Sequence, residues 1–329
     1  MKSILIPLMA SVAIAAAASG ATAAPDVVVS IKPVHSLVAA IMKGVGEPQL
    51  IVDGAASPHT YNLRPSNARK LEKADVVFWV GPGLEAFLQK PLEALASKAT
   101  VVELEDAKGL EKLPFRKGGP FEAHDHGEEG HEAHDGHTEG EGVHDHAHDH
   151  ADAEEHEHGA YDTHLWLDAA NAKAMAQAIE TALIAADAGN AATYQANTKK
   201  LIDDLDALDA EVAETVKPVK DKPFIVFHDA YQYFEHRYGV KTAGSITVSP
   251  ETLPGADRVK QMQEKVRQLG ATCVFAEPQF EPKLVSVITE GTAAKSATLD
   301  PEAATLEPGP DLYFKLMRGI AGSLKNCLS

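Results

Sequence analysis

The fold is decided by four short β-branched runs, DVVVSI (26–31), QLIVD (49–53), DVVFWVG (75–81) and TVVELE (100–105). Turn residues bound each run, as is typical of short strands. Helical patterns lie between the runs, at 35–45, 66–74 and 84–97, and Ser66 is the expected N-cap of the second helix. Because short apolar strands that alternate with helices form βαβ units, this part predicts a mainly parallel sheet flanked by helices.

The same alternation returns further along the chain. Helical patterns cover 168–186 and 191–216, and the second of these has leucine and valine at three- and four-residue steps. Four further strands are expected at FIVFHDA (224–230), GSITV (244–248), TCVFAE (272–277) and SATLD (296–300), with helices at 231–238, 256–268, 282–289 and 311–328. The sequence therefore predicts an α/β protein with two similar lobes, joined by one long rigid helix.

The expected domain limits follow from these patterns. They are a signal peptide at 1–23, an N-terminal lobe at 24–187, a linking helix at 188–218 and a C-terminal lobe at 219–329. The signal peptide has a positive Lys2, an apolar stretch at 4–18 and small residues at the cleavage site before Ala24. No other stretch approaches 18 apolar residues, so we expect an exported, periplasmic protein.

A histidine-rich segment interrupts the first lobe at about 118–160. It carries eleven of the sixteen histidines among acidic residues and glycine: His124, His126, His131, His134, His137, His144, His146, His148, His150, His156 and His158. Because the segment has too little apolar surface to offset its ordering entropy, we expect a mobile loop. Imidazoles bind divalent transition metals, so the composition predicts several weak metal sites.

Charge and cysteine content narrow the class of protein. The formal net charge is −18, and residues 121–158 hold fourteen acidic side chains and no basic one. The remaining surface is close to neutral, which argues against nucleic acid and anionic membranes as partners. Cys273 and Cys327 predict a disulfide in an exported protein, since the alternative of two buried thiols suits a reducing compartment. Closing a loop of this length would contribute about 4 kcal/mol.

Candidate metal ligands lie where strands end. His59 follows the run QLIVD, His164 lies just after the histidine-rich segment, and His228 ends FIVFH. Ligands of open α/β sheets bind beyond the carboxyl ends of strands, so these imidazoles from two lobes can converge in one cleft. Asp300 ends the last predicted strand and could bring a carboxylate to the same place.

A single histidine at a strand end is more often structural than a ligand. The three histidines become a predicted site because they occur together with the metal-binding segment. We expect His35 to open a helix and His236 to lie on a helix surface, and neither is a favoured ligand. Trp79 and Trp166 are expected in the core or in the cleft wall.

Six strings of the sequence add a family resemblance. They are GAASPHTYNLRPS (54–66), VVFWVGPGLEAF (76–87), THLWLD (163–168), FHDAYQYFE (227–235), ATCVFAEPQF (271–280) and TLDP (298–301). In this order they resemble the periplasmic zinc-binding subunits of high-affinity zinc uptake ABC transporters, the ZnuA type of the cluster A-I metal-binding family. The similarity runs over 26–328, which is nearly all of the expected mature chain.

The resemblance implies a function and a ligand set. His59, His164 and His228 match the family's zinc ligands between two lobes, and Cys273 and Cys327 match its disulfide. The implied function is capture of Zn²⁺ and its delivery to an inner-membrane ABC permease, with an accessory periplasmic zinc chaperone as a further partner. We expect a monomer.

The sequence departs from the family at the fourth ligand. Some members have glutamate before the first histidine, where this chain has Pro58. The fourth ligand is then water or Asp300, and we favour water. Three imidazoles and one oxygen suit tetrahedral Zn²⁺ better than Mn²⁺, and manganese-binding relatives have a carboxylate in place of His228. Asp229 and Glu277 are the expected acceptors that orient the ligand rings.

Alternative functions stay open from the sequence. One is a manganese or iron receptor of the same family. Another is a periplasmic zinc buffer in which residues 124–158 hold the metal. A third is a zinc enzyme, since three histidines and an open position also describe catalytic zinc. We do not expect an enzyme, because the sequence has no HExxH motif and no acid/base pair at motif spacing.

Overall fold

The computed structural model describes residues 24–116, 161–247, 254–270 and 272–329. The predicted signal peptide at 1–23 and the histidine-rich segment therefore lie outside the described residues. Within the described part, no helix is long and apolar enough to cross a membrane.

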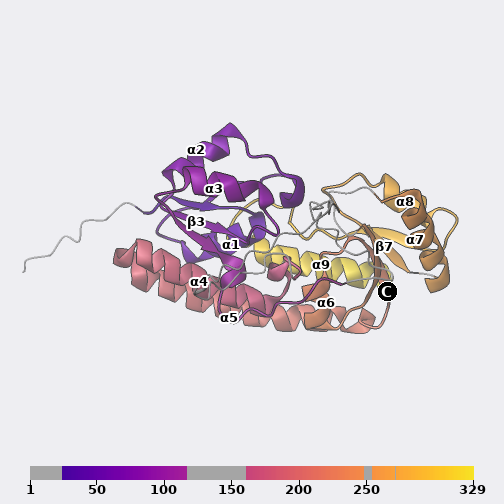
Figure 1. Cartoon of the computed structure of the whole chain (residues 1–329). Coiled ribbons are helices and arrows are strands. Elements are labelled where there is room, and N and C mark those ends of the chain that lie inside the picture. The colour runs from indigo at the N-terminus through magenta and orange to yellow at the C-terminus, as the bar shows by residue number, and fades with distance from the viewer. Residues whose placement is uncertain (1–23, 117–160, 248–253, 271) are drawn as a thin grey trace, which may run out of the picture.

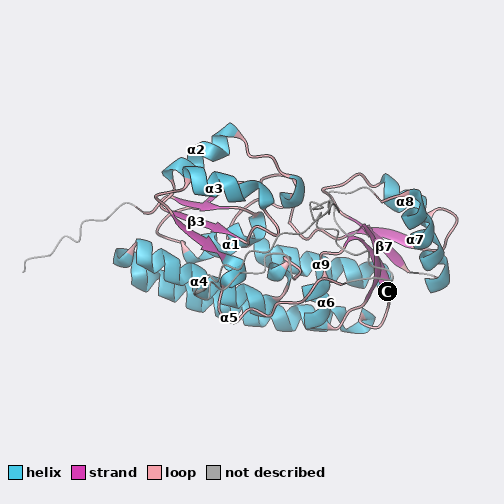
Figure 2. Ribbon diagram, in the orientation of Figure 1, coloured by secondary structure: helices cyan, strands magenta, loops and turns pink. Residues whose placement is uncertain are grey.

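The first lobe is built on a four-stranded parallel sheet (Figures 1 and 2). Its strands run in the order β2-β1-β3-β4 and are β1 (Val27–Val29), β2 (Gln49–Leu50), β3 (Val76–Trp79) and β4 (Thr100–Glu103). Helices α2 (Pro65–Lys73) and α3 (Gln89–Leu95) cover one side, and α1 (Lys32–Ile41) and α4 (Ala169–Ala186) cover the other. The central strands β1 and β3 are apolar and buried along their whole length, as strands covered by helices on both faces require.

The second lobe repeats this topology. Its parallel strands run in the order β6-β5-β7-β8 and are β5 (Phe224–His228), β6 (Thr242–Thr247), β7 (Cys273–Ala276) and β8 (Lys295–Thr298). The helices are α6 (Gln232–Tyr238), α7 (Ala256–Leu269), α8 (Lys283–Thr289) and α9 (Leu312–Leu328). In each lobe the first strand in the chain, β1 or β5, lies between two other strands. The predicted two-lobe α/β fold is confirmed.

One long helix, α5 (Ala191–Val216), runs alongside both lobes (Figure 1). Leu201, Leu205, Leu208, Val212 and Val216 are buried on it, which is the face that the leucine and valine spacing predicts. The helix packs on α4, α9 and α1. A single apolar cluster joins the first sheet, these helices and one face of the second sheet. The lobes thus share a core, which favours a fixed arrangement.

Two predicted helix starts are wrong by a few residues. Helix α1 begins at Lys32, three residues before His35, and has proline in its first turn. Helix α2 begins at Pro65 with Arg64 as its N-cap, so Ser66 is not the cap. Proline is favoured in the first turn because that turn needs no backbone N–H donor, and this outweighs the capping preference of serine. The predicted helix at 84–97 is a 3₁₀ turn, η2 (Ala86–Leu88), followed by α3.

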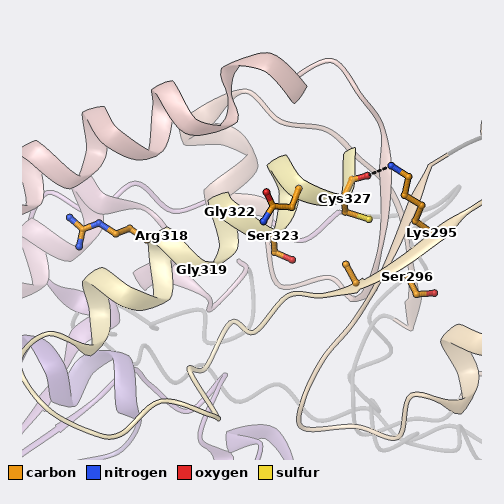
Figure 3. A pocket seen from close by; sticks show the side chains of 9 residues that line it. Lys295, Ser296, Arg318, Gly319, Gly322, Ser323 and Cys327 are labelled. Carbon is orange, nitrogen blue, oxygen red and sulfur yellow. Dashed lines mark hydrogen bonds between the residues drawn. The ribbon is translucent and has the colours of Figure 1, made fainter. Parts of the chain in front are cut away.

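A disulfide between Cys273 and Cys327 ties β7 to the end of α9, as predicted. Close by, Lys295 Nζ on β8 donates a hydrogen bond to the Cys327 carbonyl oxygen at 2.9 Å (Figure 3). A surface hollow of about 650 Å³ lies between β8 and α9, and no histidine lines it. The segment limits expected from the sequence remain a prediction. Helix α9 of the second lobe packs on α1 of the first lobe as well as on β8.

Candidate metal centre

Three histidines from separate elements meet at one point. His59 lies in the 3₁₀ turn η1 (Pro58–Thr60), His164 directly precedes η4 (Leu165–Leu167), and His228 is the last residue of β5. One ring nitrogen from each lies within 4.8 Å of the other two. His59 and His164 belong to the first lobe and His228 to the second, so the site bridges the lobes as the sequence predicts.

The separation of the ring nitrogens fits a tetrahedral metal. His164 Nε2 lies 3.3 Å from His59 Nε2 and 3.3 Å from His228 Nε2. A tetrahedral zinc with Zn–N bonds of about 2.0–2.1 Å places its ligand nitrogens about 3.3–3.4 Å apart. The ring centroids are 5.2–5.7 Å apart and no two of these rings are stacked. The rings therefore present their edges to a common point rather than their faces to one another.

Carboxylates fix the tautomer of two ligands. His164 Nδ1 lies 2.7 Å from Asp162 Oδ1, and His228 Nδ1 lies 2.8 and 2.7 Å from the two oxygens of Glu277. An ionised carboxylate only accepts, so each Nδ1 carries the proton and each Nε2 presents its lone pair. Glu277 is confirmed as a partner of His228, which follows from the topology because β5 and β7 are adjacent parallel strands that end at one edge.

Sequence reasoning missed Asp162 and misassigned Asp229. Asp162 stands two residues before His164, and its Oδ1 also accepts the His164 backbone N–H at 3.0 Å. That spacing is a local signal, since an aspartate often binds a backbone N–H two residues on. Asp229 does not bind a ligand ring through its carboxylate. Instead, its oxygens are bound by the guanidinium of Arg116.

The carboxylates around His228 raise the pKa of its imidazole. Both His164 and His228 are buried, with 4% of each residue exposed. Burial lowers the pKa of His228, but the nearby carboxylates of Glu277, Asp229 and Asp162 together more than offset this, and the pKa is raised overall. Protons therefore compete with a metal ion for this ring more strongly than for an ordinary imidazole.

Asp300 lies outside the three-histidine cluster of the described residues. Its Oδ1 accepts hydrogen bonds from Gln279 Nε2 at 2.9 Å and from the Glu302 backbone N–H at 3.2 Å. Both bonds engage Oδ1, and water as the fourth ligand stays a prediction. Pro58 is buried beside His59 and offers no side-chain donor.

The remaining histidines of the described residues do not join the cluster. His35 is in the first turn of α1, with its Nε2 3.0 Å from the Pro48 carbonyl oxygen. His236 is 54% exposed on α6, and its Nδ1 lies 3.5 Å from Glu111. Trp79 and Trp166 are buried, as expected, and the Trp166 ring lies 5.4 Å from that of His164. The eleven histidines at 124–158 lie outside the described residues.

Solved structures share this fold over nearly the whole chain. A crystal structure of ZnuA matches with a TM-score of 0.72 at 24% identity and covers 93% of this chain and 100% of that one. The periplasmic zinc-binding protein TroA from Treponema pallidum matches with a TM-score of 0.74 at 17% identity, covering 93% and 99%. The chain thus has the two-lobe fold of these metal-binding proteins.

Sequence comparison defines the family more closely. The high-affinity zinc uptake system protein ZnuA of Brucella suis is 59% identical over 305 residues, which are 92% of this chain and 91% of that protein. The protein of the same name from Paracoccus denitrificans is 39% identical over 305 residues, 92% of each chain. The family model of the periplasmic zinc-uptake complex component A matches residues 27–327. The chain therefore belongs to the ZnuA family.

Proposed function

We propose that this protein is a periplasmic receptor that binds Zn²⁺ through His59, His164 and His228 and delivers it to an inner-membrane ABC permease. The observation that carries the proposal is the meeting of three ring nitrogens within 4.8 Å, with His164 Nε2 3.3 Å from Nε2 of both His59 and His228, distances that fit tetrahedral zinc. Two of the rings are held by carboxylates in the tautomer that a metal needs. Family membership supports the same function, since the relatives are named as zinc uptake proteins.

Competition titration with a zinc chelator tests this proposal. We expect one tight site in the chain, and His59→Ala, His164→Ala or His228→Ala should each weaken it by about two or more orders of magnitude, since each removes one of few ligands. Asp300→Ala should cost little if water is the fourth ligand. Tight binding that survives loss of any of the histidines would overturn the proposed site. A loss with Asp300→Ala as large as the histidine losses would make Asp300 a ligand.

A manganese or iron receptor is the nearest alternative. The three ligating atoms are imidazole nitrogens, and the nearby carboxylates of Asp162 and Glu277 bind ring Nδ1 atoms instead of facing the metal point. Mn²⁺ prefers more oxygen ligands, so this arrangement favours zinc. Titration with Mn²⁺ should give weaker binding than with Zn²⁺, and the reverse order would support the alternative.

A zinc buffer and a zinc enzyme are distinguished by two further measurements. Deletion of residues 124–158 should leave the tight site intact and remove weaker sites, whereas a buffer would lose its high-affinity binding. A hydrolase screen of the zinc-loaded protein should show no turnover above that of free zinc, because we propose a receptor and not an enzyme.

The cellular part of the proposal rests on the family and on the N-terminal sequence. We propose that the chain is exported, cleaved before Ala24, and active as a monomer in the periplasm. Mass spectrometry of the mature protein and light scattering test cleavage and oligomeric state. Zinc-dependent stimulation of the permease's ATPase tests the partner, and a pull-down tests whether a zinc chaperone joins it.

A further inference from the structure

Arg116 connects the two lobes next to the metal centre. It belongs to the segment that follows β4 in the first lobe, yet its guanidinium binds two carboxylates of the second lobe. Nε donates to Asp229 Oδ2 at 3.1 Å and NH2 donates to Asp229 Oδ1, while NH1 and NH2 donate to the two oxygens of Glu235 at 3.0 and 2.9 Å. Bidentate pairs of this kind combine strength with fixed geometry.

These groups are shielded from water. The side chain of Arg116 is 21% exposed, that of Asp229 is 3% exposed and that of Glu235 is 11% exposed. Glu235 also accepts the Thr242 backbone N–H at 2.9 Å, so its carboxylate is anchored to β6. Salt weakens an exposed ion pair, but a shielded, fully hydrogen-bonded pair keeps more of its strength.

A tyrosine on α6 makes a second connection across the same boundary. Tyr233 Oη accepts the Leu113 backbone N–H at 3.0 Å and donates to the Asp162 carbonyl oxygen at 2.7 Å. Gln232 Nε2 donates to the Pro114 carbonyl oxygen at 3.0 Å. We call this set of bonds from Arg116, Leu113, Pro114 and Asp162 to the second lobe the α6 contact.

The α6 contact is connected to two of the proposed metal ligands through residues next to them. Arg116 binds Asp229, which directly follows His228, and Tyr233 binds the backbone of Asp162, whose carboxylate holds His164. His164 lies in the first lobe and His228 in the second, and their Nε2 atoms are 3.3 Å apart. Separation of these two rings would open the site, and the α6 contact crosses the same boundary.

We propose that Arg116 and Tyr233 are positioning residues that hold His164 and His228 in register across the lobe boundary and thereby slow the release of bound metal. The inference rests on the proposed zinc-binding function. Neither residue touches the metal, so each acts through Asp229 or Asp162. The α6 contact adds to metal retention without adding a ligand.

The test compares Arg116→Gln, Arg116→Lys and Tyr233→Phe with the wild-type chain. Zn²⁺-loaded protein is mixed with excess chelator in a stopped-flow instrument, and the release rate is measured. Arg116→Gln should release Zn²⁺ on the order of ten- to a hundredfold faster, as expected for loss of charge-assisted hydrogen bonds, and Tyr233→Phe about three- to tenfold faster. Arg116→Lys keeps the charge but not the bidentate geometry, so its rate should lie between those of Arg116→Gln and the wild type.

Arg318→Gln is the matched control. Arg318 makes a comparable bidentate pair with Glu211, with distances of 2.7–2.9 Å, between α9 and α5. Its loss should leave the release rate unchanged. The visible spectrum of the Co²⁺-loaded protein reports ligand geometry, and it should change in Arg116→Gln and remain as in the wild type in Arg318→Gln.

The outcomes separate this inference from the function on which it rests. If the wild-type chain has no tight zinc site, the proposed function fails and the inference fails with it. If the wild type binds zinc tightly but both Arg116→Gln and Tyr233→Phe release it within about twofold of the wild-type rate, only the inference fails. A lower melting temperature with unchanged release and an unchanged Co²⁺ spectrum would likewise show a purely structural role. If Arg116→Gln does not fold, the release rate of Tyr233→Phe decides.

Discussion

Replacing Glu277 with glutamine should weaken zinc binding although Glu277 is not a ligand. Its side chain is 1% exposed, and its two oxygens lie 2.8 and 2.7 Å from His228 Nδ1. Glutamine keeps one acceptor of the same shape but removes the charge. A hydrogen bond to a charged group contributes about 1.5–3 kcal/mol and a neutral one about 0.5–1.5 kcal/mol, so the loss should be about 1–2 kcal/mol, or roughly five- to thirtyfold in affinity.

The pH dependence makes this prediction sharper. Burial lowers the pKa of His228, but Glu277, with Asp229 and Asp162, raises it overall, so protons compete with zinc for this ring. Without the carboxylate the pKa of His228 should fall, and proton competition in the variant should weaken. The affinity gap between the variant and the wild type should therefore be largest near pH 8 and smaller near pH 6.

Competition titration with a chromogenic chelator at both pH values measures this gap. Glu85→Gln is the control, because Glu85 is a buried carboxylate that binds Ser30 and the backbone of Val80 and Gly81 and touches no ligand histidine. Equal zinc affinities for Glu277→Gln and the wild type at pH 8, or a gap that widens towards pH 6, would refute the reasoning.

Three further predictions concern the metal centre and the disulfide. Zinc affinity of the wild type should fall as pH drops through the raised pKa of His228, and chelator competition from pH 5 to 8 measures this. In the metal-free protein, the His228–Glu277 pair should contribute most to stability at low pH and lose this effect as pH rises through the same pKa, which thermal melts over the same pH range check. Asp162→Asn should weaken zinc binding about tenfold, because it removes the charge beside His164 Nδ1, and isothermal titration measures the loss. Replacing Cys273 and Cys327 together with alanine should lower the free energy of unfolding by up to about 4 kcal/mol in a denaturant titration, with little change in zinc affinity.

The architecture was predictable because its signals are local. The buried strands β1, β3, β5 and β7 are short β-branched or aromatic runs between turn residues, and the apolar face of α5 repeats at helical spacing. Helix starts were less predictable, because at Pro65 two local preferences compete and the fixed φ of proline outweighs the capping ability of Ser66.

The site was only partly predictable for a related reason. The positions of the three histidines near strand ends, together with the histidine-rich segment and the family resemblance, indicated the trio. The partners of these histidines depend on tertiary placement. Asp229 is next to His228 in sequence, but its side chain is bound by Arg116. Glu277, which is 49 residues after His228, binds the His228 ring instead. The link through Tyr233 could not be derived without coordinates, because it joins backbone groups.

Metal preference in this site follows from where its carboxylates are held. Asp162 and Glu277 lie close to the proposed metal centre, but both accept hydrogen bonds from ring nitrogens, and Asp300 is bound by Gln279 and the Glu302 backbone. In the proposed site the three imidazoles are the ligands, and the carboxylates of Asp162 and Glu277 act through hydrogen bonds to the rings. That arrangement offsets the charge of a divalent cation without supplying the oxygen ligands that Mn²⁺ prefers. Selectivity for zinc should accordingly depend on the hydrogen bonds that restrain these carboxylates as much as on the histidines themselves.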